Sequence, residues 1–144
     1  ADMAEEKAAE LNNKVRAGAV LRARDITLAA LNDKSKPVSR IRNATRLRTD
    51  FVISANELAT PGNKAIYVRI TSPDGYVLTT EAMPTFEFEG ERLSYSAMRE
   101  VDYDQSTDLA VAIFFNSSGF AAGTYRIELY CEGRLIGQTQ VAMR

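Results

Sequence analysis

The chain has 144 residues, 45% of them hydrophobic, which fits one β domain plus a short extra element and excludes a wholly disordered polypeptide. Its 18 Lys and Arg residues against 19 Asp and Glu residues give a net charge of −1, so the chain as a whole is not a binder of polyanions. The absence of histidine removes the commonest general base, and no apolar run approaches the roughly 20 residues that cross a membrane.

Residues 1–18 are predicted to form a helix that stops at Gly18. One side of it carries a heptad-like stripe of apolar residues, Ala4, Ala8, Leu11 and Val15. Two interpretations stay open, a lone helix lying on the domain or the end of a longer coiled coil, because two heptads are too short to establish a coiled coil. Since the chain starts at Ala1 without an initiator methionine, we expect an upstream part.

From residue 19 onward the hydrophobic period changes to two, which is typical of β-strands. The short alternating runs follow one another at the spacing of a β-sandwich. The predicted strands lie at residues 26–30, 46–54, 66–70, 76–80, 86–88, 93–95, 101–103, 109–115, 124–131 and 134–143. Residues 32–43 are polar and contain a proline, so a loop or edge is expected there.

The last two strands form the clearest pattern in the chain. Tyr125, Ile127, Leu129 and Cys131 alternate with Thr124, Arg126, Glu128 and Tyr130, which places the first set on a core face and the second toward water. The following Glu132-Gly133 allows a tight reversal, because glycine tolerates a positive φ. The sequence therefore predicts an all-β, immunoglobulin-like β-sandwich over residues 19–144, preceded by a short N-terminal helix.

Two sets of residues carry a resemblance to known families. Gly123-Thr124-Tyr125 resembles the Gly-x-Tyr corner of immunoglobulin-like and fibronectin-type modules. A longer set is similar to the C-terminal domain of Bacteroidetes coiled-coil proteins that are often labelled chromosome partitioning or segregation proteins. Its members are Asn56, Pro61, Gly62, Lys64, residues 66–70, Pro73, Gly75, Phe86, Gly90, Tyr95, Ser96 and residues 123–137. The resemblance covers about residues 20 to 144, implies a sandwich at the end of a coiled coil, and supplies no catalytic residues.

Charge is distributed unevenly along the chain. Residues 34–48 contain six cations and no anions. The cations are all at even positions: Lys34, Lys36, Arg40, Arg42, Arg46 and Arg48. Wherever this stretch is extended, these side chains would share one face. Residues 81–108 carry eight acids, Glu81, Glu87, Glu89, Glu91, Glu100, Asp102, Asp104 and Asp108, against two arginines.

Three interpretations of these two charged stretches stay open. They pair within the fold or are solvated, they dock a charged partner or a second protomer, or the basic strip contacts nucleic acid. The last is disfavoured, because no aromatic residues interleave with the cations to stack on bases.

Tyrosines suggest a second partner surface. Tyr67, Tyr76, Tyr103 and Tyr130 fall at outward positions, either as ordinary strand residues or as part of a binding face. Outward residues of two strands would meet in one sheet of an immunoglobulin-like fold, namely Tyr67, Arg69, Arg126 and Tyr130. Because Tyr and Arg are enriched at interface hot spots, we expect a partner there.

No candidate for catalysis or a cofactor emerges, and the chain is predicted not to be an enzyme. Asp102, Asp104 and Asp108 alternate as calcium ligands do, but Thr107 replaces the glycine of a calcium loop, so an acidic loop is favoured. Cys131 falls on an inward face and is expected to be a buried, inert thiol.

Two functions follow as hypotheses. The first is a non-enzymatic interaction module of a coiled-coil cell-envelope or periplasmic protein, which binds a protein or glycan partner and self-associates through its N-terminal helix. The alternative is a cytoplasmic coiled-coil protein of chromosome partitioning that contacts nucleic acid through residues 34–48.

Overall fold

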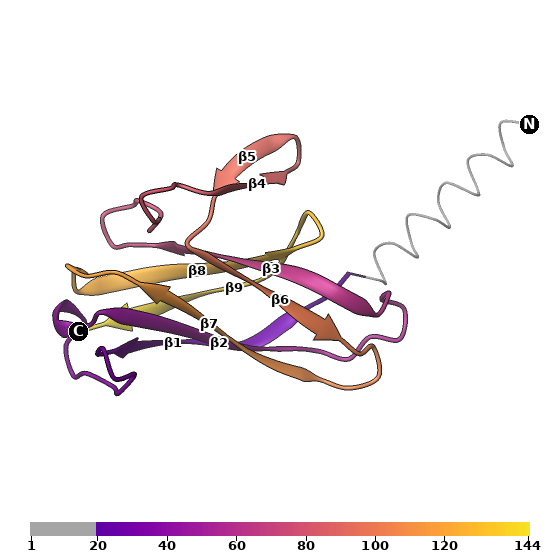
Figure 1. Cartoon of the computed structure of the whole chain (residues 1–144), viewed down its shortest axis with the longest axis horizontal. Helices are drawn as coiled ribbons and strands as arrows, with labels where there is room; N and C mark the ends of the chain where they lie inside the picture. Colours follow the sequence, from indigo (N-terminus) through magenta and orange to yellow (C-terminus); the bar gives the residue numbers. More distant parts are fainter. Residues whose placement is uncertain (1–19) are drawn as a thin grey trace, which may run out of the picture.

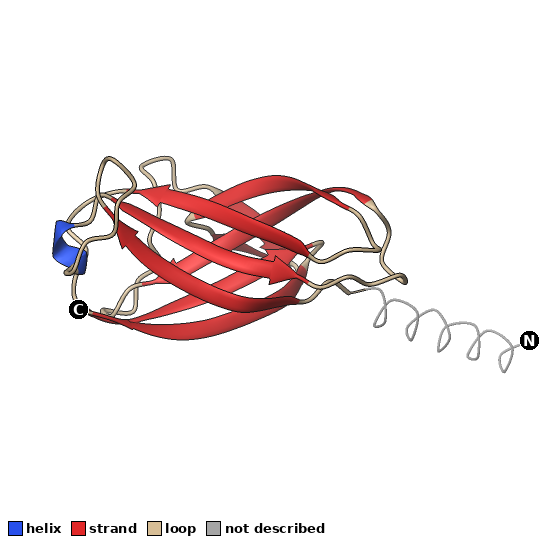
Figure 2. Ribbon diagram, turned by 90° about the horizontal axis from the view of Figure 1, so that it is seen from below, coloured by secondary structure: helices blue, strands red, loops and turns tan. Residues whose placement is uncertain are grey.

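The computed structural model describes residues 20–144, so the predicted helix over residues 1–18 lies outside the described residues. The described part is all-β, with one 3-10 turn (Figures 1 and 2). Its elements are β1 (Ala23–Leu31), η1 (Ile41–Asn43), β2 (Arg46–Ile53), β3 (Gly62–Thr71), β4 (Thr85–Phe88), β5 (Glu91–Ser94), β6 (Ala97–Tyr103), β7 (Leu109–Asn116), β8 (Gly123–Cys131) and β9 (Arg134–Met143).

Two antiparallel sheets face each other across one hydrophobic core. The three-stranded sheet has the order β1-β2-β7, and the four-stranded sheet has the order β6-β3-β8-β9. The largest fully buried side chains come from both sheets, among them Leu47 and Phe51 of the first and Ile66 and Tyr125 of the second. This arrangement is the two-layer solution for sheets that are apolar on one face.

Alternation along the strands selects which residues enter the core. In β2 the inward positions predicted from the sequence, Leu47, Thr49, Phe51 and Ile53, are all buried, whereas the residues between them are partly exposed. In β8 the predicted inward set, Tyr125, Ile127, Leu129 and Cys131, is buried as well. These predictions are confirmed, because a period of two assigns each strand residue to one face.

A β4–β5 hairpin forms a third, two-stranded layer on the outer face of the four-stranded sheet, at the top of Figure 1. In the sequence, the hairpin lies between β3 and β6, and these two strands are neighbours in that sheet. Its turn, Glu89-Gly90, has φ values of 50° and 81°, and the β8–β9 turn, Glu132-Gly133, has 52° and 72°. Positive φ at both central residues matches the twist of paired strands, which explains the same Glu-Gly dipeptide at both turns.

One expected strand is absent, and the segment over residues 32–43 is a loop with a short 3-10 turn. Residues 76–80 do not form a strand and make only an isolated bridge, Thr71↔Val77, after the turn that is closed by the Gly75 N–H bond to Ser72. Residues 32–43 contain η1, whose Ile41 is buried with 2% exposure. The Ile41 N–H donates to the carbonyl of Arg144, at 2.6 Å, so the chain end holds this turn (Figure 2).

Two tyrosines anchor the ends of the core. Tyr103 was predicted to point outward, but it is only 1% exposed, and its hydroxyl donates to the Ser54 carbonyl at 3.0 Å. The prediction is wrong because Tyr103 follows the alternation of β6, in which Val101 and Tyr103 are buried and Asp102 between them is exposed. At the opposite end the Tyr125 hydroxyl donates to the Ala121 carbonyl, four residues upstream. A polar tip satisfied by a loop carbonyl lets a large aromatic ring be fully buried.

Candidate functional site

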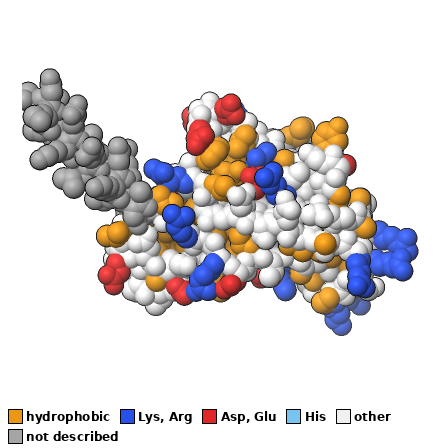
Figure 3. Space-filling model, turned by 180° about the vertical axis from the view of Figure 1, so that it is seen from behind, with side chains coloured by type: hydrophobic (Ala, Val, Ile, Leu, Met, Phe, Trp, Pro, Cys, Tyr) orange, Lys and Arg blue, Asp and Glu red, His pale blue; other side chains and the backbone are white. Residues whose placement is uncertain are grey.

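The predicted basic residues gather at one end of the sandwich, where the β1–β2 connection and η1 lie. In Figure 3 this end is at the right, where Lys and Arg side chains are concentrated. Only Arg46 and Arg48 share a strand face, because residues 32–45 turn instead of extending. The shared face that was expected wherever this stretch is extended is therefore limited to Arg46 and Arg48. Lys34, Lys36, Arg40 and Arg42 are exposed and make no side-chain hydrogen bond or ion pair with another residue of the described chain.

Arg46 is the most constrained of these cations. Its Nε donates to Asn116 Oδ1 at 2.8 Å, and its Nη1 donates to Ser35 Oγ at 2.6 Å. Its guanidinium lies over the ring of Phe114, 5.3 Å from the ring centre. A cation above an aromatic face is attracted by the ring quadrupole, so the guanidinium is held in one orientation.

Phe114 is a residue that the sequence reasoning missed. It lies on β7 between the buried Ile113 and Phe115, points to the outer face of the three-stranded sheet, and is 44% exposed. The strand register places it directly opposite Arg48, whose Nε pairs with Asp50 Oδ2 at 2.7 Å. The available signal was a phenylalanine at a position where alternation predicts a polar residue.

The basic and acidic stretches do not pair with each other in the described part of the chain. The ion pairs there are Arg24–Asp25, Arg24–Asp108, Arg48–Asp50, Lys64–Glu132 and Arg69–Glu128. Asp108 is the only member of the predicted acidic stretch in any of them, and its partner Arg24 lies outside the basic stretch. Pairing of the basic stretch with the acidic stretch, one of the open interpretations, is therefore not observed among the described residues.

The tyrosine surface predicted from the sequence is covered. Tyr67 and Tyr130 are indeed neighbours on β3 and β8, but the β4–β5 hairpin packs its aromatic rings on them. Phe86 stacks on Tyr67 with ring centres 4.8 Å apart and 9° between the planes, and it lies 5.0 Å from Tyr130. Tyr130 is only 3% exposed, so the prediction that it points toward water is wrong. Its burial and its hydrogen bond to Glu128 raise the pKa of the Tyr130 hydroxyl.

The two arginines of the same predicted surface have different environments. Arg69 is half-buried, and its Nε donates to the Ser94 carbonyl at 2.8 Å. Its Nη1 lies 3.6 Å from Glu128 Oε1, which forms an ion pair. Arg69 therefore helps to hold the hairpin. Arg126 lies two residues before Glu128 on the outward side of β8 and is exposed. It is therefore the part of the predicted surface that solvent reaches.

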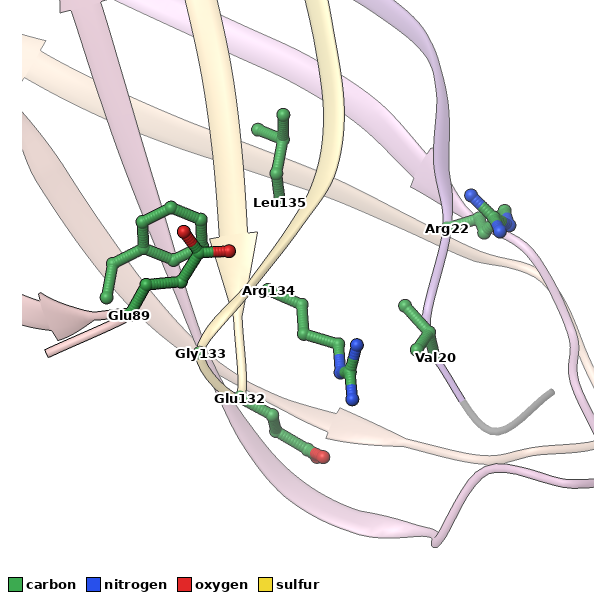
Figure 4. Close-up of a pocket in the computed structure, with 8 residues that line it drawn as sticks. Val20, Arg22, Glu89, Glu132, Gly133, Arg134 and Leu135 are labelled. Atoms are coloured by element: carbon green, nitrogen blue, oxygen red, sulfur yellow. The ribbon is translucent and has the colours of Figure 1, made fainter. Parts of the chain in front are cut away.

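An open groove of about 740 Å³ lies between the two Glu-Gly hairpin tips and the start of the described chain (Figure 4). Its charged side chains are of both signs, Arg22 and Arg134 against Glu89 and Glu132. Glu132 is also the ion-pair partner of Lys64, which is only 9% exposed. These charges of both signs leave the groove without a net preference for an anionic or a cationic ligand.

The weak calcium candidate Asp102, Asp104 and Asp108 does not form a cluster. Over residues 20–144, no group of three or more His, Cys, Asp or Glu side chains is placed to hold a metal ion. The hydroxyl and N–H of Ser106 bind Asp104 and lower the pKa of its carboxyl group. The Ala55 N–H is the main cause, with Arg24, of the lowered pKa of Asp108. Both carboxylates therefore serve to close loops.

Cys131 is buried in the core with 2% exposure. Burial is the main cause that raises the pKa of its thiol to about 12. The predicted burial is confirmed, and the thiolate, which is the reactive form of cysteine, is disfavoured at neutral pH.

Within residues 20–144, no helix is long and apolar enough to cross a membrane. A comparison with curated proteins finds no match. Residues 24–144 match the family described as a domain of unknown function, DUF8428, and the chain belongs to that family.

Proposed function

We propose that the domain is an immunoglobulin-like module. Two observations support this assignment. The strand orders β1-β2-β7 and β6-β3-β8-β9 correspond to the two sheets of such a sandwich, with the β4–β5 hairpin as an insertion. Tyr125, near the start of the penultimate strand, bonds a carbonyl four residues upstream, as the tyrosine corner of these modules does.

We further propose that the module is a non-enzymatic interaction domain that docks an acidic protein surface with its basic end. The observation that carries this proposal is the set of exposed cations without carboxylate partners, Lys34, Lys36, Arg40 and Arg42, next to the oriented Arg46. Unneutralised charges of one sign steer a partner of the opposite sign and select against like-charged ones.

The experiment measures binding of a fluorescently labelled peptide of alternating Glu and Ser by anisotropy at low and high salt. The wild-type chain is expected to bind, and the double variant Arg40→Glu/Arg42→Glu to lose at least about tenfold in affinity, because two charges change sign. The matched control is Arg92→Glu/Arg126→Glu, which changes the net charge equally but on β5 and β8. Equal affinity of both double variants would refute the proposal.

Nucleic acid is the alternative partner, and the exposed Phe114 beside Arg46 and Arg48 is the observation in its favour. An aromatic ring within a basic patch is what single-strand binding uses. The same titration with a single-stranded oligonucleotide separates the two. A steeply salt-dependent affinity for the oligonucleotide, with none for the peptide, would select the chromosome-partitioning hypothesis.

In the whole protein, we propose that a coiled coil formed by residues 1–18 and upstream sequence presents several such modules and converts weak binding into avidity. We also propose a cell-envelope or periplasmic location, with the cytoplasm as the alternative. Cell fractionation of the native protein tests the location, since recovery with the cytoplasmic fraction would contradict it.

A further inference from the structure

The outer face of the three-stranded sheet carries an apolar centre beside its charges. Phe114 is 44% exposed there, and on the same face of β7 it lies between Asn116 and the small residue Ala112, with Ala110 one outward position further. Across the register, Ala29 of β1 lies beside Arg48. In contrast, the four-stranded sheet has its outward rings covered by the β4–β5 hairpin. Small side chains around one exposed ring give a shallow surface on which a side chain of a partner can rest.

The guanidinium of Arg46 is preorganised at the edge of this surface. Asn116, Ser35 and the Phe114 ring fix it, while its Nη2 has no hydrogen-bond partner among the described residues. Holding an arginine in one orientation removes part of the entropy cost of binding a carboxylate. Phe114 and Arg46 together therefore have the composition of an interface hot spot, in which aromatic and arginine side chains predominate.

We propose that this face, centred on Phe114 and Arg46, binds an acidic protein segment that carries an apolar side chain next to its carboxylates. The proposal rests on the proposed function and names the partner class more closely. The apolar side chain packs on Phe114, and a neighbouring carboxylate accepts hydrogen bonds from Arg46. Arg48 on the same face is already paired with Asp50, so Arg46 is the cation of this face that is left to a carboxylate of the partner.

The test uses two labelled acidic peptides that differ in one residue. The first alternates Glu and Ser, and the second has one central Ser replaced by Leu. The wild-type chain is expected to bind the Leu peptide about tenfold more tightly, since burying a leucine side chain contributes at least one such factor. In Phe114→Ser the two peptides should bind equally, whereas Phe114→Leu should keep most of the preference.

The controls separate failure of this inference from failure of the proposed function. Leu58→Ser removes another exposed apolar side chain, 65% exposed in the β2–β3 loop, and should leave the preference unchanged. If Arg40→Glu/Arg42→Glu weakens both peptides but Phe114→Ser does not change their ratio, the proposed function stands and this inference is overturned. If the wild-type chain binds neither peptide, both fail. If Phe114→Ser instead weakens only binding of a single-stranded oligonucleotide, the face serves nucleic acid and the inference is overturned.

Discussion

The two outer faces of the sandwich carry aromatic rings, but they differ in what covers them. On the four-stranded sheet, Tyr67 and Tyr130 lie under Phe86 of the β4–β5 hairpin. On the three-stranded sheet, the guanidinium of Arg46 lies over the ring of Phe114, which is otherwise 44% exposed among residues 20–144. The same residue class therefore contributes to stability on one face and remains available to a partner on the other. The aromatic content of a strand alone does not identify a binding surface.

The largest expected effect of this difference concerns Phe86, which is 8% exposed and stacks on the covered face. Phe86→Ala should lower the free energy of unfolding by about 3 kcal/mol, because the ring leaves a cavity between the hairpin and the sheet. Urea unfolding followed by circular dichroism measures the change. A loss below about 1 kcal/mol would show that the hairpin adds little to the fold.

Ser96 tests how the hairpin segment is attached. Its hydroxyl accepts the Ile70 N–H at 2.9 Å and donates to the Leu78 carbonyl, and the residue is 3% exposed. Ser96→Ala leaves both buried groups without a partner and should cost about 2 kcal/mol in the same unfolding assay. Ser106→Ala in an exposed loop is the matched control, expected to cost about 0.5 kcal/mol or less. Equal losses in the two variants would contradict this role of Ser96.

Alkaline pH should weaken the fold through its buried phenols. Burial is the main cause that raises the pKa of Tyr103, Tyr125 and Tyr130. As the pH rises past about 10, the unfolded chain loses these protons first and binds fewer than the folded one, so the free energy of unfolding falls. Below that pH this contribution is fully present.

Tyr130 reports on the covered face in this titration. Tyr130→Phe removes one of the three contributions and should make the alkaline fall shallower, whereas Tyr76→Phe, at a residue 74% exposed, should leave it unchanged. Unfolding by urea at a series of alkaline pH values checks both variants. An unchanged slope in Tyr130→Phe would mean that solvent reaches this hydroxyl.

The smallest expected effect on stability comes from a substitution on the outer face of the three-stranded sheet, called here the open face. Phe114→Ala should lower the free energy of unfolding by only about 0.5 kcal/mol, since it removes an exposed ring and its stacking with Arg46. The same unfolding assay measures it beside Phe86→Ala. A loss as large as that of Phe86→Ala would mean that Phe114 has a structural role, and the open face would lose its main argument as a binding surface.

Alternation in the sequence predicted most of the strands and their inward residues, as in β2 and β8, because each depends only on its own neighbours in the chain. It failed at Tyr130, whose outward position was correct but whose cover comes from a hairpin about forty residues earlier. Residues 32–43 form a loop, which is one of the two predicted alternatives, but the turn η1 and the burial of Ile41 within it were not predicted, because they involve a contact with the distant chain end. Phe114 was missed because its exposure depends on which sheet the β4–β5 hairpin packs against. The alternation within a single strand contains no information on that packing.

The most direct test of the account is an amide chemical-shift map of the isotope-labelled chain titrated with the Leu-containing acidic peptide. The largest shifts are expected to cluster on the outer face of the three-stranded sheet, at Arg46, Arg48 and Phe114. Shifts confined to the β4–β5 hairpin and the outer residues of β3 and β8 would contradict it, because they would place the binding surface on the face that the hairpin covers.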